Sequence, residues 1–212
     1  MHLRMKRYDA YIFDFDNTLV DSEYGYSISL AKAFAEFDMP YDESRYNEYI
    51  RTPLSILFNQ YHPNSPCRYR DFVSVVTATY SRVYLESVRL FPDAEACIDS
   101  MTVEGIPMGI ASNSYTEHLH GILRRLGLQD RFLSVIGIDK VSMGKPDPEA
   151  VLLCAEEMDM SHSDIVMVGD SENDIRAGAF AGMETILIDR AGDFEPAVSP
   201  TFIVSSLIDM IQ

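Results

Sequence analysis

Short apolar runs alternate with amphipathic segments along most of the chain. An apolar run of four to eight residues between turn signals is typical of a strand that is buried on both faces. Such runs occupy residues 10–13, 107–111, 132–138, 165–168, 185–188 and 202–204. We therefore expect six strands, of which the first is separated from the others by about ninety residues of different character.

Helical patterns fill the intervals between the later strands. One apolar stripe consists of Leu119, Ile122, Leu123 and Leu126, and Gly127 follows it as an expected C-cap. Similar stripes lie at 150–158 and 175–183. Strands that alternate with helices predict an α/β fold with three α/β/α layers, in which the parallel sheet is doubly wound and Rossmann-like.

The stretch from residue 20 to residue 90 shows helical periodicity and no convincing strand. Ile28, Ala31, Phe34 and Ala35 predict the apolar face of one helix, and the pattern at 72–84 predicts a long final helix. We therefore expect a core domain of residues 1–19 and 91–212, with a small α-helical domain inserted at 20–90.

Charge and composition exclude several classes of function. The formal net charge of −16 argues against a nucleic acid or an anionic membrane as partner. No apolar stretch approaches the roughly 20 residues of a membrane span, and no signal peptide is expected at the N-terminus. Cys67, Cys97 and Cys154 form no Cys-x-x-Cys pair, which favours reduced thiols. We expect a cytoplasmic monomer or homodimer.

Polar groups capable of chemistry follow four of the predicted strands. In open parallel sheets the ligand crevice lies beyond the carboxyl ends of the strands, so these groups should meet there. In chain order they are Asp14, Asp16 and Thr18; Ser112 and Asn113; Lys145; and Asp170 and Asp174.

The acidic members of this set predict a divalent cation. Asp14 and Asp16 are two residues apart at a strand end, so they start on the same side of the strand. Buried like charges are unfavourable unless a cation or a shared proton relieves them. Mg²⁺ binds through carboxylate oxygens, and Asp14, Asp170 and the Asp16 carbonyl could supply them.

The same groups suit phosphoryl transfer. The carboxylate of Asp14 could attack phosphorus, and Asp16 could protonate a leaving alcohol and later deprotonate water. Lys145 offers a compact positive charge to phosphate oxygens. Ser112 offers a hydroxyl, and the N–H groups at 113 and 114 are expected to open a helix whose N-terminus suits anions.

Four stretches of the chain resemble the motifs of the haloacid dehalogenase superfamily, and the match spans nearly the whole chain. They are Asp14-Phe-Asp-Asn-Thr-Leu-Val-Asp21, Ser112-Asn113, Gly144-Lys-Pro-Asp-Pro148 and Val168-Gly-Asp-Ser-Glu-Asn-Asp-Ile175. The helical insertion resembles the small C1-type cap of phosphoglycolate phosphatases and β-phosphoglucomutases. The one departure in the first motif is Asn17, where glycine is commoner, and Asn also tolerates the left-handed backbone.

The resemblance implies a role for each residue of the set. It implies Asp14 as nucleophile, Asp16 as general acid and base, and Mg²⁺ held by Asp14, the Asp16 carbonyl and Asp170. It implies that Asp174 either reaches the metal through water or holds Lys145. The positions that it implies for phosphate handling are Thr18, Ser112, Asn113 and Lys145.

These observations predict a Mg²⁺-dependent phosphatase that hydrolyses a small phosphorylated metabolite, such as phosphoglycolate or a sugar phosphate, through an aspartyl-phosphate. Asp16 favours phosphoryl transfer over dehalogenation, since halide leaves without a proton. A phosphonatase would need a lysine in the cap, and Lys32, the one lysine between residues 20 and 90, is expected to face solvent. Two alternatives remain, a sugar-phosphate mutase and a non-catalytic phospho-ligand binding protein on the same fold.

Arg51 is the candidate for substrate choice. It lies in the predicted cap, and arginine forms bidentate pairs with a carboxylate or a second phosphate. The alternative is a surface salt bridge from Arg51 to Glu48 or Glu43.

Overall fold

The computed structural model describes residues 6–52, 54–61, 66–192 and 194–211. The chain divides into two compact units. One consists of Met1–Asp21 and Leu90–Gln212 and is called the α/β unit below; the other, Ser22–Arg89, is called the helical unit. Each is described by itself.

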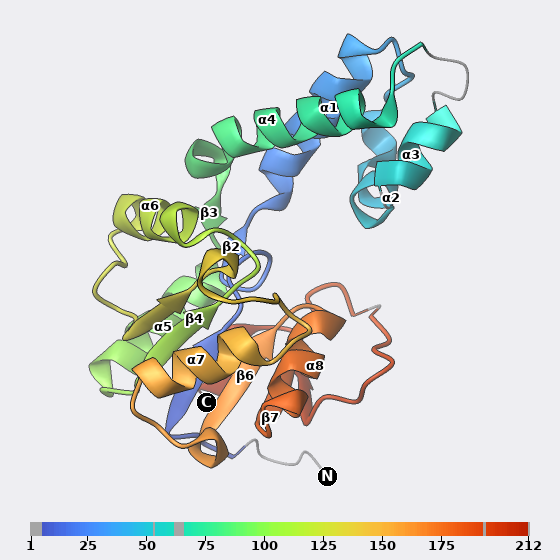
Figure 1. Cartoon of the computed structure of the whole chain (residues 1–212). Helices are drawn as coiled ribbons and strands as arrows, with labels where there is room; N and C mark the ends of the chain where they lie inside the picture. Colours follow the sequence, from blue (N-terminus) through green and yellow to red (C-terminus); the bar gives the residue numbers. More distant parts are fainter. Residues whose placement is uncertain (1–5, 53, 62–65, 193, 212) are drawn as a thin grey trace. The chain divides into compact units, whose positions relative to one another are not determined.

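A six-stranded sheet in the order β5-β4-β1-β6-β7-β8 forms the centre of the α/β unit (Figure 1). Every neighbouring pair is parallel. The strands are β1 (Ala10–Phe13), β4 (Met108–Ala111), β5 (Ser134–Ile136), β6 (Ile165–Gly169), β7 (Glu184–Ile188) and β8 (Phe202–Val204). The predicted doubly wound parallel sheet is thus confirmed, and β1 lies at its middle because two later strands pair with it from either side.

Helices cover both faces of this sheet. They are α5 (Pro92–Val103), α6 (Thr116–Leu126), α7 (Glu149–Glu157) and α8 (Glu172–Phe180), with the 3₁₀ turns η2 (Ile138–Lys140), η3 (His162–Asp164) and η4 (Leu207–Met210). On one face Val151 and Cys154 of α7 pack against Ile12 and Met167 in a buried cluster. Since side chains alternate along a strand, Tyr11 points to the other face, where its hydroxyl interacts electrostatically with Cys97 of α5.

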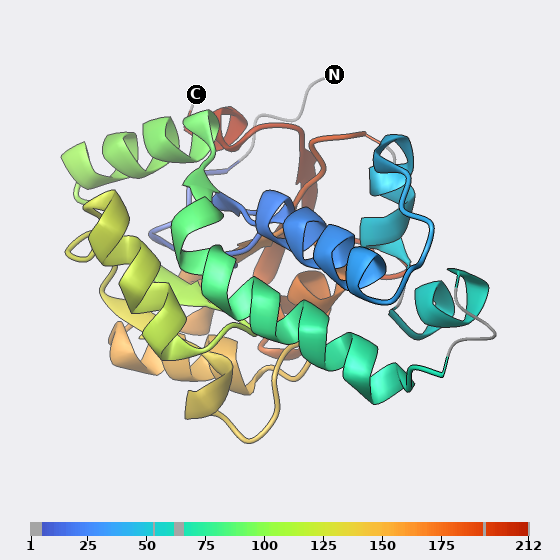
Figure 2. The same ribbon diagram turned by 90° about the horizontal axis from the view of Figure 1, so that it is seen from above.

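The helical unit contains η1 (Glu43–Arg45), α1 (Glu23–Glu36), α2 (Tyr46–Arg51), α3 (Leu54–Tyr61) and α4 (Tyr69–Ser87). In Figure 1 and Figure 2 α1 runs alongside α4, and these two helices share many contacts. Phe34 of α1 lies at the centre of an aromatic core, with its ring centroid 5.5 Å from those of Tyr41 and Tyr49 and 5.9 Å from that of Phe72.

The buried face of α1 differs from the predicted one. Its buried members are Gly25, Ser29, Leu30, Ala33 and Phe34, whereas the predicted Ala35 is exposed. Small residues allow α4 to approach closely, since a Cβ on Gly25 would lie 2.6 Å from the Ser87 Oγ. The apolar pattern was misleading because glycine and serine, which are not strongly apolar, form part of this contact face.

Two short strands were missed in the stretch from 20 to 90. They are β2 (Val20–Asp21) and β3 (Arg89–Leu90), which pair with each other where the chain passes between the units. A strand of two residues is too short to show alternation, so periodicity could not detect it. Among the helices that the structure describes, none has the length and apolarity of a membrane span.

Candidate active site

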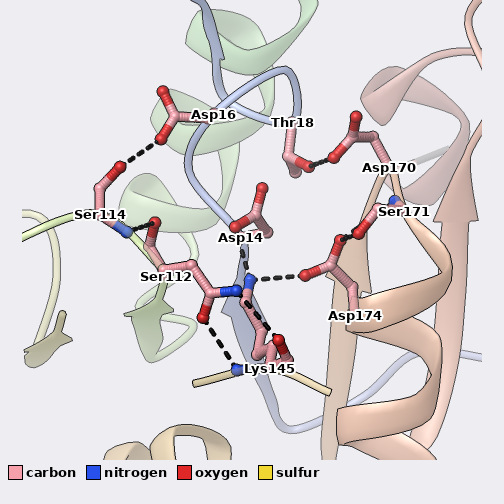
Figure 3. Close-up of polar contacts among 10 residues, drawn as sticks. Asp14, Asp16, Thr18, Ser112, Ser114, Lys145, Asp170, Ser171 and Asp174 are labelled. Carbon is pink, nitrogen blue, oxygen red and sulfur yellow. Dashed lines mark hydrogen bonds and ion pairs between the residues drawn. The ribbon is translucent and has the colours of Figure 1, made fainter. Parts of the chain in front are cut away.

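The predicted site residues of the α/β unit meet at the carboxyl ends of the central strands (Figure 3). Asp14 directly follows β1, Ser112 follows β4 and Asp170 follows β6. Backbone bonds continue the sheet just beyond β1 and β4, because the Asp14 N–H donates to the Val168 carbonyl at 2.8 Å and the Ser112 N–H to the Ile136 carbonyl at 2.9 Å. The side chains therefore leave the sheet at one edge, as the parallel topology predicts.

Lys145 lies at the centre of the site, between two carboxylates. Its Nζ is 2.5 Å from the Oδ1 of Asp14 and 2.5 Å from the Oδ1 of Asp174. The Lys145 side chain is only 3% exposed, and those of Asp14 and Asp174 are 10% and 2% exposed. Each charge therefore depends on its partner, because a buried charge left alone costs several kcal/mol.

The electrostatics of this cluster leave negative charge in excess. Burial raises the pKa of Asp14 well above its usual range, and the Lys145 charge opposes this rise. Burial lowers the pKa of Lys145, but the charges of Asp14 and Asp174 outweigh it and keep the ammonium protonated. Burial and the Asp174 charge raise the pKa of Asp170 to about 7. A further positive charge here would favour ionised carboxylates.

The carboxylates fit a divalent cation. Oxygens of Asp14, Asp170 and Asp174 all lie within 4.8 Å of one another. Hard carboxylate oxygens are the ligands that Mg²⁺ prefers, and the excess negative charge described above is the charge that a cation would balance. The donor set is therefore suitable for Mg²⁺, with Asp14 and Asp170 as its most available members.

Asp174 uses both of its oxygens inside the protein. Its Oδ1 accepts from Lys145, and its Oδ2 accepts from the Ser171 N–H at 3.0 Å and from the Ser171 Oγ at 2.5 Å. These contacts place Asp174 beside Lys145, as one of the two roles that the sequence left open requires.

Asp16 and Thr18 contact different parts of the site. The Ser114 Oγ donates to the Asp16 Oδ2 at 2.6 Å, away from the Lys145 pair (Figure 3). The Thr18 Oγ1 donates to the Asp170 Oδ1 at 3.4 Å, and Thr18 is fully buried. Between them Asn17 has φ of 57°, so this asparagine adopts the left-handed backbone that the sequence predicts.

Asn113 holds the Lys145 backbone with its side chain. Its Oδ1 accepts from the Lys145 N–H at 2.8 Å and its Nδ2 donates to the Lys145 carbonyl at 3.0 Å. The side chain of Asn113 therefore joins the second and third motifs, and its part in phosphate handling stays a prediction. Gly144 leaves room for this amide, since a Cβ there would lie 2.5 Å from the Asn113 Oδ1.

The helix after the second motif begins later than predicted. We expected the N–H groups at 113 and 114 to open it, whereas α6 begins at Thr116. The Ser114 N–H donates to the Ser112 Oγ at 3.1 Å, and the Thr116 N–H donates to the Asp139 Oδ1 at 2.7 Å. A carboxylate of the protein thus binds the N-terminus of α6, while the Ser112 hydroxyl still has a proton to donate.

Two residues that contact the site, Ser171 and Ser114, were not singled out in the sequence. Ser171 and Asp174 follow the Ser-x-x-Asp pattern of a capping box, which could have revealed their contact. Ser114 shows no comparable local signal, because its partner Asp16 is 98 residues away. The side chain of Arg51 lies outside the described residues.

Comparisons with known proteins agree with this fold. Residues 11–188 match the family model described as haloacid dehalogenase-like hydrolase. The chain is 26% identical to the phosphoglycolate phosphatase of Yersinia pestis, over 99% of this chain and 94% of that protein. It is 28% identical to that of Rhodospirillum rubrum, over 90% and 83%. The crystal structure of CbbY from Rhodobacter sphaeroides in complex with phosphate aligns with a TM-score of 0.70 and 22% identity, over 94% of this chain and 95% of that one.

Proposed function

The chain belongs to the haloacid dehalogenase-like hydrolase family, and on this basis we propose that it is a Mg²⁺-dependent phosphatase acting on a small phosphate monoester. The observation that carries the proposal is the buried carboxylate of Asp14, paired at 2.5 Å with Lys145 and close to Asp170. Relatives named phosphoglycolate phosphatase match nearly the full length of the chain and support a phosphate ester as substrate.

In the proposed first step, Asp14 attacks phosphorus. A carboxylate oxygen of Asp14 forms a bond to phosphorus while the bond from phosphorus to the alcohol oxygen breaks. Asp16 gives its proton to this departing oxygen, so that a neutral alcohol leaves. Mg²⁺, held by Asp14, the Asp16 carbonyl and Asp170, would neutralise part of the phosphoryl charge.

In the second step the aspartyl-phosphate is hydrolysed. Asp16, now a carboxylate, takes a proton from water, and the resulting hydroxide attacks phosphorus. The bond from phosphorus to the Asp14 oxygen breaks, which releases inorganic phosphate and restores the Asp14 carboxylate. Lys145 holds its positive charge beside Asp14 throughout, where it stabilises the charge of the phosphoryl oxygens. The Ser114 hydroxyl orients Asp16 through their bond of 2.6 Å.

We further propose that the helical unit, Ser22–Arg89, is the cap domain that the resemblance implies. Cap domains inserted after the first strand govern access of substrate, and closure keeps bulk water out during the first step. Arg51 in this unit is the candidate for reading a second acidic group of the substrate.

The first test is phosphate release from a panel of esters, with and without Mg²⁺, by the wild-type protein and by Asp14→Asn. The panel contains phosphoglycolate, sugar phosphates, nucleotides and pyrophosphate. Removing the nucleophile should lower release by at least roughly 10³-fold, while the far-ultraviolet circular dichroism stays unchanged. Asp99→Asn, an exposed aspartate, is the matched control and should retain full activity.

Residual release above a tenth of the wild-type rate in Asp14→Asn would refute the nucleophile assignment. Conversion of β-glucose 1-phosphate to its 6-phosphate in place of phosphate release would identify a mutase and contradict the proposal. Absence of both activities with the wild-type protein would favour a binding function.

A further inference from the structure

Arg190, just beyond β7, reaches the loop that carries Asp16 and Thr18. Its Nη2 donates to the Thr18 carbonyl at 2.8 Å, although the two residues are 172 positions apart. Its Nη1 forms an ion pair with Asp93, and its guanidinium carbon lies 4.1 Å from the Phe91 ring centroid. All four residues belong to the α/β unit, and the Arg190 side chain is only 25% exposed. One side chain thus joins three segments of the chain.

Asp93 is itself firmly held. Its Oδ2 accepts from the Leu207 N–H at 2.9 Å and from the Ser206 Oγ at 3.2 Å. Burial tends to raise the pKa of Asp93, but hydrogen bonds from Arg190 and from the Leu207 N–H outweigh it and keep the pKa below its usual value. Asp93 is therefore an anchored negative charge that fixes the direction of the guanidinium.

Backbone hydrogen bonds also support the loop that Arg190 binds, among them the bond from the Asn17 N–H to the Val20 carbonyl at 2.7 Å. The Leu19 carbonyl accepts from the Phe91 N–H at 3.0 Å, and the N–H groups of Leu19 and Val20 turn back to the Phe15 carbonyl at 3.0 and 3.1 Å. Thr18 contacts Arg190 through its carbonyl and Asp170 through its hydroxyl. A shift of Thr18 would therefore be transmitted to Asp170.

We propose that Arg190, anchored by Asp93, is a positioning residue that holds the Thr18 carbonyl and so keeps Asp16 and Asp170 in their working places. This inference rests on the proposed function, because it concerns the same site. Arg190 touches none of the reacting groups, and its effect passes through the loop. Misplacement of catalytic groups by about 1 Å costs on the order of 10²-fold in rate, which is the scale of the effect expected.

The test compares Arg190→Ala, Arg190→Lys and Asp93→Asn with a control, Arg131→Ala. In the wild type Arg131 forms an ion pair with Asp99 in the same unit. Arg190→Ala should lower kcat by roughly 10- to 100-fold, with KM changed less than about twofold. Lysine keeps the charge but lacks the fork that spans Asp93 and the Thr18 carbonyl, so Arg190→Lys should lose about tenfold. Arg131→Ala should match the wild type.

Hydrogen–deuterium exchange gives a readout that needs neither substrate nor metal. The amides of Leu19 and Val20 should exchange at least about tenfold faster in Arg190→Ala and in Asp93→Asn, and at the wild-type rate in Arg131→Ala. If Arg190→Ala does not fold, Arg190→Lys and Asp93→Asn carry the test.

Folded Arg190 variants with kcat and exchange rates within twofold of the wild type would overturn the inference. Faster exchange without loss of kcat would also overturn it, since the loop would then not govern the chemistry. A wild-type protein without phosphatase activity would refute the proposed function instead, and the exchange rates would still decide whether Arg190 holds the loop.

Discussion

Gly169, the last residue of β6, makes room for the ion pair at the centre of the site. A Cβ at this position would lie 2.3 Å from the Cβ and 2.3 Å from the Cγ of Asp174, which is closer than non-bonded atoms approach. Asp174 holds Lys145, and Lys145 holds Asp14. Because Gly169 has no Cβ, Asp174 has room to stay beside Lys145, and Lys145 stays beside Asp14.

Gly169→Ala should displace Asp174 and lower kcat by roughly 10- to 100-fold, because Lys145 and Asp14 move with it. Gly105→Ala is the control. Gly105 has φ of +69° and nothing within 4 Å of a Cβ, so this change strains the backbone, costing about 1–2 kcal/mol of stability, without crowding the site. Steady-state kinetics at a temperature where each variant is folded would separate the two effects. Equal activity of the two variants would contradict the role given to Gly169.

At the scale of elements, helix α6 receives its N-terminal cap from a distant turn. The Asp139 Oδ1 accepts from the Thr116 N–H at 2.7 Å and from the Thr116 Oγ1 at 2.9 Å. Asp139 is not next to α6 in the sequence, because it belongs to η2, which follows β5. The contact ties the helix after β4 to the loop after β5, next to the segment that carries Ser112 and Ser114.

Asp139→Ala should lower the free energy of unfolding by about 1 kcal/mol at pH 7, as expected for the loss of a helix cap. The bond from the Thr116 N–H holds the pKa of Asp139 below its usual value. This stabilisation is therefore present above the ordinary aspartate pKa of about 4 and is lost as the pH falls through the lower folded-state pKa. Urea titrations at pH 7 and pH 3 measure it.

The difference in stability between the wild type and Asp139→Ala should be smaller at pH 3 than at pH 7, whereas Asp130→Asn, an exposed control, should match the wild type at pH 7. A difference at pH 3 as large as that at pH 7 would show that the carboxylate is not the source of the stabilisation.

At the scale of the whole molecule, a net charge of −16 is combined with a buried carboxylate cluster. Screening by any salt weakens the repulsion between surface charges. Binding of a cation at the cluster is a separate effect, since it stabilises the folded chain by mass action, by about 2.7 kcal/mol at a hundred times the dissociation constant. A variant that lacks the Asp170 carboxylate separates the two effects, because it removes an expected ligand of the cation.

Millimolar MgCl₂ should raise the melting temperature of the wild type above that in NaCl of equal ionic strength. Asp170→Asn should abolish this extra rise, because it removes one expected ligand, and Asp99→Asn should preserve it. Without Mg²⁺, Asp170→Asn should be at least as stable as the wild type, since it removes a buried charge whose pKa is already raised to about 7. Scanning calorimetry measures both; an equal rise in all three proteins would refute the site.

The alternation of strands and helices in the α/β unit and the gathering of Asp14 and Asp170 could be predicted from the chain alone. The run 10–13 became β1 with the same bounds, and the carboxylates that follow β1 and β6 meet because ends of neighbouring parallel strands share one edge of a sheet. These predictions succeeded because apolar periodicity and strand topology are local or general rules.

The partners of individual side chains were decided only by tertiary structure. Asn113 binds the Lys145 backbone, Ser114 binds Asp16, and Arg190 binds the Thr18 carbonyl across 172 positions. Each of these polar groups had several chemically equivalent partners in the sequence. Hydrogen bonds need atoms within about 3 Å, and only the packing of helices and strands brings a particular donor and acceptor to that distance.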